Sequence, residues 1–474
     1  MKMIIGGKQY ESEKKIEVIN PYTKTVIDTV PDASNEEVRE ALEYAEKGAK
    51  EWGEVPLYSR IEVMNKISEL IYEHAEELAL SVSLECGKPI SQARSEVSGA
   101  SFIFKCYAER ARSLVGEFYP MGHAPNVEND IIVTFRQPLG VVACIIPFNY
   151  PVDLYAEKVA PALVMGNAVI IKPASDAPLT DIKLTQLILD AGVPCNAIQV
   201  ITGKGETVGN WLCETSVVNA VSFTGGTETG CEIYRNSSRY LHHLELELGG
   251  NDPFIICEDA DIEKAVEEVF VGRIINAGQT CCGSKRFIVH KAVEETFVQK
   301  LTDSFEKIIM GNPMDEKTTL GPMISEKAAK KTEEQINYTI KQGAKLAFGG
   351  KRIMDTFIEP TILTNVTPEM DIARDMEVFG PVVPVIRFTD IEEAIKISNQ
   401  TRYGLSAGVM TSNMENAFKV AKELECGCVT IGGCGNYRSV LQPFGGWKMT
   451  GQGHEGVGYT LEEMSVLKTV AIKR

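Results

Sequence analysis

The sequence predicts an α/β protein containing a doubly wound, Rossmann-like parallel sheet, and three observations support this fold class. Short apolar runs alternate with helical stretches from Gly140 onward. These runs lack a period-two alternation of polar residues, which is typical of strands covered on both faces. The alternation starts again at Pro253 and continues to about Gly446. Because strand–helix alternation builds parallel sheets, we expect two α/β units.

Two helices are predicted ahead of the first alternating region. Ser34 and Glu37 have capping-box spacing, which predicts a helix that starts there and runs towards Trp52. A longer amphipathic helix is predicted from about Tyr58, and Gly87 can end it in the left-handed conformation. Both helices have the pattern of packing elements without chemistry of their own.

The first alternating region predicts four strands with helices between them. We expect strands at residues 141–146, 168–171, 198–201 and 218–223, and helices after Pro151, at 179–191 and at about 206–213. In a doubly wound sheet, ligands bind beyond the carboxyl ends of the strands. The loops at residues 147–150, 172–175, 202–205 and 224–230 should therefore face one crevice.

The second region predicts a similar unit, and two segments lie outside the alternation. We expect a helix at 261–276, a strand at 287–289 and a charged helix at 325–342. The segments at 116–136 and 462–474 contain strand-like stretches with no evident local partner. Such strands often pair with another subunit, so these two segments are candidates for subunit contacts.

Charge and hydropathy exclude several functional classes. The chain has 474 residues and a formal net charge of −17, which argues against nucleic acid or anionic membrane as a partner. No apolar run approaches the roughly 18 residues that a membrane-spanning helix requires. The amino-terminal residues do not have the pattern of a signal peptide. A small anionic substrate is not excluded, because it requires only local cations.

The cysteines predict reduced thiols in a cytoplasmic protein. The chain has 12 cysteines and 6 histidines, and most cysteines lie inside apolar runs. Residues 426–434, with Cys426, Cys428 and Cys434, come nearest to a metal cluster, but histidine ligands and a second cysteine pair are missing. We therefore expect no metal site.

Three residues carry candidate chemistry, although each also has a structural interpretation. Cys281 follows a Gly-Gln-Thr turn, which can hold a thiol at a loop tip. Glu247 is separated by a single residue from two glycines, where a backbone can approach closely. Asn149 lies between two aromatic residues in front of Pro151, where it is equally suited to a turn or a helix cap. Taken singly, none of them assigns a function.

Seven motifs in order give a far more specific indication. They are Pro-Phe-Asn-Tyr-Pro (147–151), Lys-Pro-Ala-Ser (172–175), Phe-Thr-Gly-Gly-Thr-Glu-Thr-Gly (223–230), Glu-Leu-Gly-Gly (247–250), Gly-Gln-Thr-Cys (278–281), Glu-Val-Phe-Gly-Pro (377–381) and Pro-Phe-Gly-Gly (443–446). This pattern resembles the aldehyde dehydrogenase superfamily, and the resemblance spans nearly the whole chain. It implies NAD(P)-dependent oxidation of an aldehyde to a carboxylic acid.

The resemblance implies catalytic roles that suit the residue types. Cys281 would attack the aldehyde carbon as a thiolate to give a thiohemiacetal, and loss of hydride would leave a thioester. The Asn149 side-chain amide and the Cys281 backbone N–H would stabilise the oxyanion. Glu247 would activate water against the thioester.

The resemblance also implies a site for NADP or NAD that differs from the usual GxGxxG turn. Lys172 would reach the adenosine ribose. Ser175 stands where family members with Glu repel a 2′-phosphate, which favours NADP, whereas Asp176 next to it disfavours NADP. Glu377 would hold the nicotinamide ribose, and Phe379 would pack near the ring. The implied cofactor-binding residues are Pro147, Phe148, Lys172, Ser175, Gly203, Phe223, Thr224, Gly225, Gly226, Thr227, Glu247, Leu248, Gly249, Glu377 and Phe379.

The substrate is less well defined. The segment at 435–438 resembles the branch of lactaldehyde and non-phosphorylating glyceraldehyde-3-phosphate dehydrogenases, in which an Arg near this position can face the substrate. Arg438 would then bind a carboxylate, phosphate or sulfonate of a short aldehyde, or else it is an interfacial or solvated Arg. Asn149 and Thr280 are the other implied substrate-binding residues. Thr280 stands where phosphate-recognising relatives often have Arg, which argues against a phosphorylated substrate. Glu157 stands where succinic semialdehyde dehydrogenases have a substrate-binding Arg, which argues against succinic semialdehyde.

Three alternative functions remain open at this point. They are a succinic semialdehyde dehydrogenase, a CoA-acylating dehydrogenase that passes the acyl group to a thiol, and a catalytically silent binding protein on the same fold. Glu247 argues against the second, because a water-activating base would destroy the thioester. The adjacent Cys282 is expected to be inert, since vicinal disulfides are strained.

The resemblance implies three structural parts. Residues 1–118 and 138–249 would form the cofactor-binding domain, residues 250–447 the catalytic domain, and residues 119–137 and 448–474 a small β oligomerisation element. A homodimer or homotetramer is therefore expected.

Overall fold

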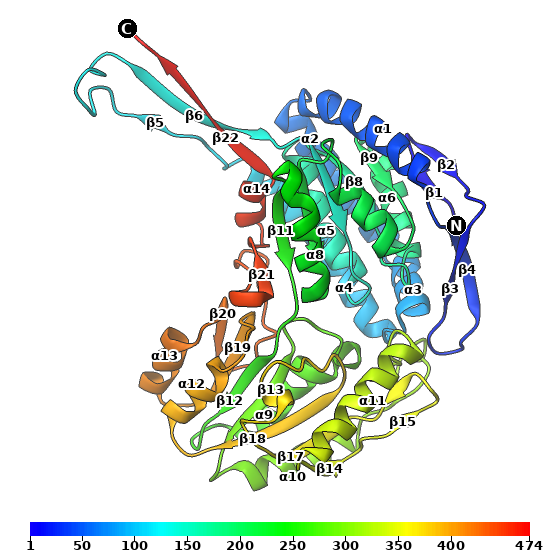
Figure 1. The fold of residues 1–474 in the computed structure, drawn as a ribbon, viewed down its shortest axis with the longest axis vertical. Coiled ribbons are helices and arrows are strands. Elements are labelled where there is room, and N and C mark those ends of the chain that lie inside the picture. Colours follow the sequence, from blue (N-terminus) through cyan, green and yellow to red (C-terminus); the bar gives the residue numbers. More distant parts are fainter.

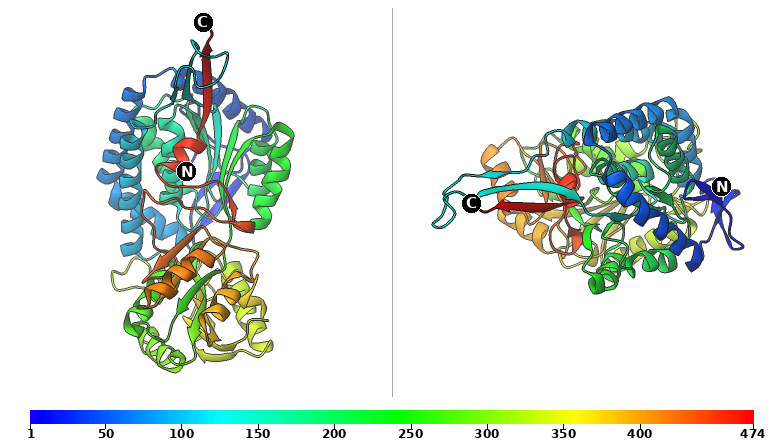
Figure 2. Two further views of the ribbon diagram at one scale, coloured as in Figure 1. Left: turned by 90° about the vertical axis from the view of Figure 1, so that its left-hand side faces the viewer. Right: turned by 90° about the horizontal axis from the view of Figure 1, so that it is seen from above.

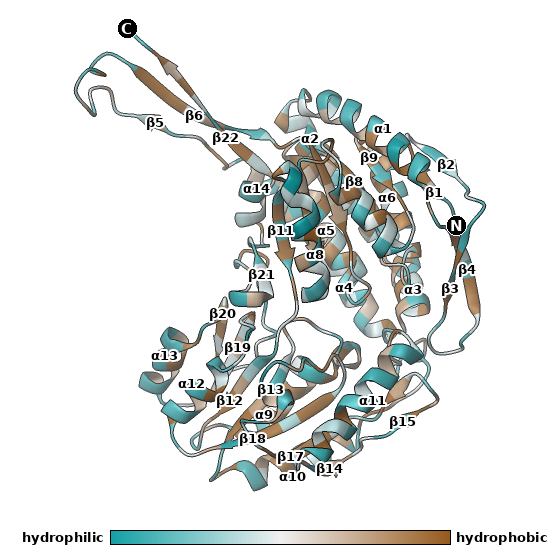
Figure 3. Ribbon diagram, viewed as in Figure 1, coloured by the Kyte–Doolittle hydropathy of each residue, from teal (hydrophilic) through white to brown (hydrophobic).

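Two mostly parallel sheets, one in each half of the chain, organise the fold (Figure 1). The computed structural model describes residues 1–474. The first sheet has the strand order β2-β1-β9-β8-β7-β10-β11-β21, and the second has the order β14-β17-β18-β13-β12-β19-β20. Two hydrophobic cores accompany them, the first built almost wholly from residues up to 248 and the second from residues 254–434. Figure 3 shows the central strands in brown, while the helix α11 at the surface is largely teal.

The first sheet contains the four strands that the sequence predicts, and its central strands are parallel. Its strands are β1 (Met3–Ile5), β2 (Lys8–Tyr10), β7 (Val141–Ile145), β8 (Ala168–Lys172), β9 (Ile198–Val200), β10 (Ala220–Thr224), β11 (His243–Glu247) and β21 (Gly451–Gln452). Strands β9, β8, β7, β10 and β11 run parallel, whereas β1 and β21 are antiparallel to their neighbours. The loops that follow β7, β8, β9 and β10 therefore leave the same edge of the sheet.

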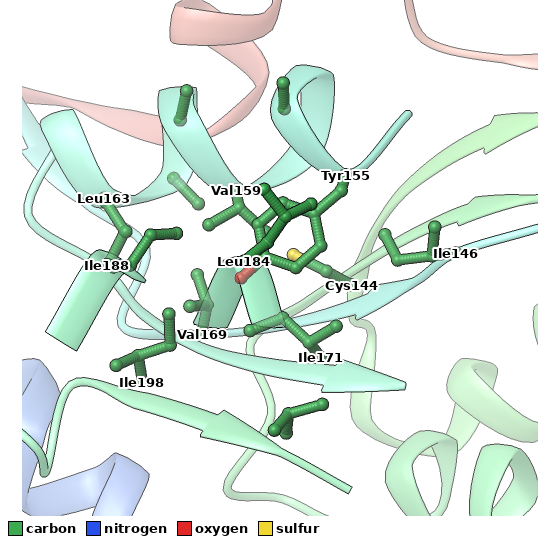
Figure 4. Packing of buried hydrophobic residues seen from close by; sticks show 14 of the residues in the cluster. Cys144, Ile146, Tyr155, Val159, Leu163, Val169, Ile171, Leu184, Ile188 and Ile198 are labelled. Carbon is green, nitrogen blue, oxygen red and sulfur yellow. The ribbon is translucent and has the colours of Figure 1, made fainter. Parts of the chain in front are cut away.

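Helices α5 (Pro151–Val164) and α6 (Leu179–Ala191) pack against these parallel strands. Figure 4 shows Tyr155, Val159 and Leu184 from the helices against Cys144, Ile171 and other strand residues. All of these side chains are at most 1% exposed. Burial on both faces explains the continuous apolar runs that marked these strands in the sequence.

The second sheet repeats the parallel arrangement. Its strands are β12 (Asp252–Ile256), β13 (Ser284–His290), β14 (Lys345–Phe348), β17 (Thr361–Val366), β18 (Val382–Phe388), β19 (Ser406–Met410) and β20 (Cys428–Ile431). Only β14 is antiparallel to its neighbour, and β20 lies at the opposite edge. Its helices are α9 (Ile262–Val269), α10 (Glu294–Phe305), α11 (Glu326–Lys341), α12 (Ile391–Asn399) and α13 (Met414–Glu423).

The amino-terminal helices begin as predicted but divide differently. Helix α1 (Asn35–Gly53) starts with the Ser34–Glu37 capping box. The predicted long helix is two helices, α2 (Leu57–Glu73) and α3 (Ala75–Cys86), separated at His74. Both helices pack against α4 (Ile90–Ala111) and α6. Because the apolar residues therefore continue across the break, the sequence pattern did not indicate where the first helix ends. Gly87 ends α3 with φ +73°.

Two other predicted helices are shorter than expected. The stretch at 206–213 forms a π-helical turn at Gly205–Gly209, followed by the four-residue α7 (Asn210–Cys213). The helix predicted at 261–276 ends at Val269 and gives way to a π-helical turn and a 3₁₀ turn up to Gly278. Helix α8 (Thr227–Ser237) lies between β10 and β11 in the chain.

The two segments outside the alternation form an arm that projects from the body (Figures 1 and 2). Strand β22 (Ser465–Ile472) pairs along its whole length with β6 (Ile131–Pro138), and β6 also pairs with the short β5 (Phe118–Tyr119). The two segments thus have no partner nearby in the sequence, as expected, and they pair with each other in one β element. Their pairing joins residues more than 300 positions apart, which local sequence cannot reveal.

Several shorter elements complete the chain. Helix α14 (Tyr459–Glu463) leads into β22, and hairpins are formed by β3 (Lys15–Ile19) with β4 (Val26–Pro31) and by β15 (Arg352–Ile353) with β16 (Phe357–Ile358). No helix is long and apolar enough to cross a bilayer. The boundary predicted at residue 250 falls in the segment between β11 and β12, and the division into domains remains a prediction.

Candidate active site

Three loops bring the candidate catalytic residues together where the two sheets meet. Asn149 lies between β7 and α5, Glu247 is the last residue of β11, and Cys281 lies in the turn just before β13. Cys281 and Glu247 are close enough for the charge of the thiolate to raise the pKa of the carboxyl group. The Asn149 side chain reaches the cysteine loop directly, because its Nδ2 donates to the carbonyl oxygen of Gln279 at 3.0 Å.

A strained turn shapes the loop that carries Cys281. Asn276 and Ala277 have φ of +54° and +53°, a conformation that costs free energy for residues other than glycine. Hydrogen bonds hold the turn in place: Asn276 Nδ2 donates to the Asn149 carbonyl at 2.8 Å, and Gln279 Oε1 accepts from the Ile324 N–H at 3.0 Å. Lys285 Nζ also donates to the Cys281 carbonyl. The position of the nucleophile is therefore fixed by the loop of Asn149.

Asn149 retains a free donor in this arrangement. A side-chain amide has two N–H groups, and only one bond from Nδ2, to Gln279, is formed. Asn149 is 4% exposed, so its second N–H acts in a site that excludes most water. Such a donor fits an oxyanion that develops next to Cys281.

Cys281, the candidate nucleophile, rests as a thiol. A hydrogen bond with the Cys282 side chain and burial raise the pKa of Cys281 well above its ordinary value. The positive charges of Lys285 and Arg438 oppose this shift. Because the thiolate is the reactive form, attack on an aldehyde requires a group that takes up the thiol proton.

Glu247 has the properties of such a group. Its side chain is 4% exposed, and neither carboxylate oxygen has a hydrogen-bond partner in the protein. Burial, and then the charge of Cys281, raise the pKa of Glu247 well above that of an exposed carboxyl group. A buried polar group without a partner is rare in folded proteins, and it is expected where a water or a reactant is to be bound. Glu247 is therefore free to accept a proton from water or from the thiol.

A buried ion-pair cluster lies next to Glu247 and Cys281. Arg438 Nη2 donates to Glu157 Oε1 and to Glu455 Oε2, both at 3.0 Å, and its guanidinium lies 4.2 Å from the ring centroid of Phe444. Lys158 Nζ donates to the other oxygen of Glu455 at 2.9 Å. Arg438 is thus not a solvated Arg, because it is paired with two buried carboxylates. For the same reason, its full charge is not available to a substrate.

Arg438 nevertheless keeps donors for a ligand. Only Nη2 of its guanidinium bonds to protein groups, and its side chain is 25% exposed. Burial works against the charge, but the carboxylates of Glu157 and Glu455 raise the pKa of Arg438 above its ordinary value. It therefore stays charged at neutral pH. Thr280, the other candidate substrate contact, is 6% exposed, and its hydroxyl lies 3.4 Å from that of Tyr150.

Candidate residues for the adenosine end of a dinucleotide follow β8 and β9. Lys172 is 3% exposed, and its Nζ donates only to the Pro173 carbonyl at 2.8 Å. Burial lowers the pKa of Lys172 to about 8. The Ser175 hydroxyl donates to the Gly203 carbonyl at 3.1 Å, which fixes one loop against the other. Lys172 ends β8, and Ser175 lies in the loop that follows it.

The loop after β10 suits a pyrophosphate. A side chain at Gly225 would collide with the ring of Phe223, whereas Gly226 caps α8 and faces open space. Open backbone at a helix amino terminus binds phosphate groups well, because N–H groups and the helix dipole point at the ligand. Two neighbouring candidates pack around this loop: Thr227 Oγ1 donates to the Met449 carbonyl at 3.3 Å, and the Leu248 side chain lies next to Gly230. The Thr224 hydroxyl is buried without a hydrogen-bond partner, and Pro147 is half-buried.

The candidate nicotinamide residues converge from both halves of the chain. The rings of Phe148 and Phe379 meet edge-on, with centroids 6.2 Å apart. The Glu377 carboxylate is 3.2 Å from Lys285 Nζ and accepts from the Gly250 N–H at 3.3 Å. A Cβ at Gly249 would lie 2.5 Å from Glu377 Oε2, so any larger residue there would displace this carboxylate. The donors, glycines and aromatic rings present fit a nicotinamide dinucleotide.

The sequence analysis missed several residues of this site. Asn276 and Gln279 set the cysteine loop, and Lys285 links Cys281 to Glu377. Lys158 and Glu455 are at most 1% exposed. Charged residues inside the mostly apolar helix at 151–164, Lys158 among them, were an available indication, because a charged residue is rarely buried unless it is paired.

Comparison with known proteins agrees with this geometry. The family model described as "Aldehyde dehydrogenase family" matches residues 8–470. A 3-sulfolactaldehyde dehydrogenase of Priestia aryabhattai is 38% identical over 470 residues, which cover 99% of this chain and 97% of the relative. A lactaldehyde dehydrogenase of Methanococcus vannielii is also 38% identical, with 99% of both chains covered. The solved structure of a glyceraldehyde-3-phosphate dehydrogenase, GapN, of Methanocaldococcus jannaschii in complex with NADP matches with a TM-score of 0.93 at 37% identity, over 98% of this chain and 100% of the other.

The chain therefore belongs to the aldehyde dehydrogenase family, as the seven motifs predict. It is an NAD(P)-dependent aldehyde dehydrogenase, which confirms the predicted fold class and reaction class.

Proposed function

We propose that the protein oxidises a short 2-hydroxyaldehyde, of the lactaldehyde type and with or without a terminal anion, to the free carboxylic acid. The observation that carries the hydrolytic outcome is Glu247, whose two buried carboxylate oxygens have no partner and which lies close to Cys281. The substrate class rests on Arg438 and on the relatives named for lactaldehyde and 3-sulfolactaldehyde.

Cys281, Asn149 and Glu247 act at successive steps of the reaction. Glu247 takes the thiol proton of Cys281, and the sulfur attacks the aldehyde carbon to give a thiohemiacetal. The free N–H of Asn149 and the Cys281 backbone N–H stabilise the oxyanion. The bound nicotinamide supplies the acceptor for the hydride that leaves this carbon. A thioester on Cys281 then remains. Glu247 first releases the thiol proton to solvent, and as a carboxylate it then deprotonates the water that hydrolyses the thioester; Cys281 leaves as a thiolate and regains a proton from Glu247.

Release to water, not to CoA, follows from the same carboxylate. A base that lies next to the thioester and is free to bind water would hydrolyse it before a bulky thiol arrived. Sustained turnover to free acid in the absence of CoA is the expected result, and CoA-dependent turnover would contradict the proposal.

The pairing of Arg438 favours a small hydroxylated substrate. Glu157 and Glu455 offset its charge, so an anionic tail gains less from it than from an unpaired Arg. Its unpaired donors still suit a hydroxyl or sulfonate oxygen. Glu157 also places a carboxylate near any terminal carboxylate of the substrate, which disfavours succinic semialdehyde.

For the cofactor, we propose that NADP is accepted together with NAD. Burial raises the pKa of Asp176, and the charges of Lys327 and Lys172 oppose this rise, so two cations lie near this acidic side chain. Ser175 adds no charge that would repel a 2′-phosphate. GapN of M. jannaschii, in complex with NADP, provides a precedent in the family.

We further propose that the arm carries the subunit contacts of a homodimer or homotetramer in the cytoplasm. Phe118, Phe135, Leu467 and Ile472 on the arm are 41–62% exposed, which is unusual for large apolar side chains on strands. All 12 cysteines are free thiols, which suits a reducing compartment. Light scattering of the protein and of Leu467→Asp would test the assembly; a monomeric wild type contradicts it.

The decisive experiment is an aldehyde panel assayed with NAD and with NADP, without CoA. It contains lactaldehyde, glycolaldehyde, 3-sulfolactaldehyde, glyceraldehyde 3-phosphate and succinic semialdehyde. We expect the highest kcat/KM for lactaldehyde and 3-sulfolactaldehyde, and Cys281→Ala should abolish turnover. A preference for succinic semialdehyde would overturn the substrate proposal, and an absence of all turnover would favour a silent binding protein.

A further inference from the structure

The amino terminus of α5 is capped by a side chain from another helix. Tyr150, at the N-cap position of α5, forms no side-chain cap, and Pro151, the first helical residue, has no N–H to satisfy. The next two N–H groups, of Val152 and Asp153, both donate to Glu96 Oε1 of α4, at 2.9 and 3.4 Å. Since the N–H groups at a helix start need an acceptor and favour a negative charge, Glu96 completes the first turn of α5.

The other oxygen of the Glu96 carboxylate is held by a buried lysine. Lys88 Nζ donates to Glu96 Oε2, and both side chains are 1% exposed. The same ammonium lies 3.8 Å from the ring centroid of Tyr150, which is a cation–π contact. Glu96 is therefore bound through both oxygens, and its place relative to the start of α5 is fixed. Neither Glu96 nor Lys88 takes part in the mechanism above.

Asn149 lies between this buried pair and the loop of the nucleophile. On the nucleophile side, its Nδ2 donates to the Gln279 carbonyl, and its own carbonyl accepts from Asn276 Nδ2. On the other side, α5 begins two residues after Asn149, so the first turn of this helix restrains its backbone. The Tyr150 hydroxyl, 3.4 Å from that of Thr280, joins the two sides. A shift of the start of α5 would therefore move the Asn149 amide relative to the nucleophile.

We propose that Glu96 is a positioning residue for Asn149: by capping α5, it fixes the side-chain amide at the place where the oxyanion forms. Glu96 does not contact the reacting atoms and acts only through the start of the helix. The inference rests on the proposed role of Asn149 as an oxyanion donor. Such a donor works because its geometry is set before the reaction, and a displacement of about 1 Å can cost up to roughly 10²-fold in rate.

A second glutamate caps the next helix along the chain and offers a matched control. Glu85 of α3 accepts from the N–H groups of Leu179 and Thr180, at 2.7 and 2.9 Å, and from the Thr180 hydroxyl. These residues start α6, which follows β8 and its last residue, Lys172. Loss of this cap should therefore loosen the fold to a similar degree without moving Asn149.

The test removes the capping oxygen alone. Glu96→Gln and Glu96→Leu are compared with Lys88→Met present in both, so that neither variant leaves a buried cation without a partner. Gln keeps an oxygen that can accept from the Val152 N–H, whereas Leu has a similar volume and no acceptor. Formation of NADPH in the first turnover is followed by stopped flow with lactaldehyde at saturating NADP.

We expect the Leu variant to form NADPH about tenfold more slowly than the Gln variant, because displacing an oxyanion donor costs less than the roughly 10²–10³-fold of removing one. The affinity for NADP, measured by calorimetry, should be the same in both, since the cap acts on the oxyanion donor. In the background of Asn149→Ala, the difference between the two variants should vanish, because the amide through which Glu96 acts is missing. Glu85→Leu should form NADPH at the wild-type rate.

Three outcomes would overturn the inference. Equal rates in the Gln and Leu variants would show that the cap does not set the position of Asn149. A difference that persists in the Asn149→Ala background would show that Glu96 acts on another part of the site. An equal slowing in Glu85→Leu would indicate general loosening of the fold. A wild-type rate in Asn149→Ala by itself would contradict the proposed role of Asn149, which is a separate failure.

Discussion

Glu157→Gln offers the sharpest test of how the site selects its substrate. In the wild type, two carboxylates and two cations form the cluster of Glu157, Glu455, Arg438 and Lys158. The variant removes one negative charge, yet the Gln oxygen can still accept from Arg438 while its NH2 group donates to the Tyr107 hydroxyl, which is 2.6 Å from Glu157 in the wild type. The cluster therefore becomes more positive by one charge with little change in shape.

The size of the effect follows from Coulomb's law. One unit charge at about 8 Å from a substrate sulfonate, with an effective dielectric constant of about 20, is worth ~2 kcal/mol. Since 1.4 kcal/mol corresponds to a factor of ten, the ratio of kcat/KM for 3-sulfolactaldehyde over lactaldehyde should rise roughly 30-fold. Burial raises the pKa of Glu157, so its charge, and with it the effect of the variant, should be larger at higher pH.

The assay is steady-state kinetics with both aldehydes, in which lactaldehyde serves as the internal control. Arg438→Gln should shift the same ratio in the opposite direction. A ratio in Glu157→Gln that stays at the wild-type value, or that falls, would refute the assignment of Arg438 to the substrate tail. A thermal unfolding curve close to that of the wild type excludes general damage.

Three further predictions concern the loop, the cofactor and the backbone. Asn276→Ala removes the bond to the Asn149 carbonyl and leaves a left-handed residue unsupported; we expect a loss of about 1–3 kcal/mol in stability and a slower NADPH burst, measured by thermal unfolding and stopped flow. The pKa of Lys172 is lowered to about 8, so its side chain is charged below pH 8 and neutral above it. The KM for NADP should therefore rise above pH 8, while the KM for NAD stays constant. Parallel pH profiles for the two cofactors would contradict a contact between Lys172 and the 2′-phosphate. Gly249→Ala places a methyl group 2.5 Å from Glu377 Oε2 and displaces this carboxylate, at a cost of about 1–3 kcal/mol. If Glu377 binds the ribose, the affinity for the dinucleotide, measured by calorimetry, should therefore fall by at least about tenfold.

The sequence alone identified the chemistry because that chemistry is carried by short motifs. Cys281, Glu247 and Asn149 each lie at the end of a strand or in a tight turn, and the type of residue at such a point restricts what it can do. The central strands of both sheets were also evident, since burial on both faces leaves continuous apolar runs. The predicted lengths failed where the backbone leaves regular geometry, as at residues 270–278, because the positive φ of Asn276 and Ala277 is imposed by distant contacts.

Only the tertiary structure shows which charged groups, far apart in the chain, pair with one another. Arg438 is 281 residues from Glu157, and Lys158 is 297 residues from Glu455. Nothing in the local pattern at these positions indicates their pairing, because a buried charge is stabilised by whichever opposite charge the fold brings to it. The same holds for β22, whose partner β6 lies more than 300 residues earlier in the sequence. Residue type sets the available reactions, while the folded environment sets the charge and proton balance that determine which substrate is used.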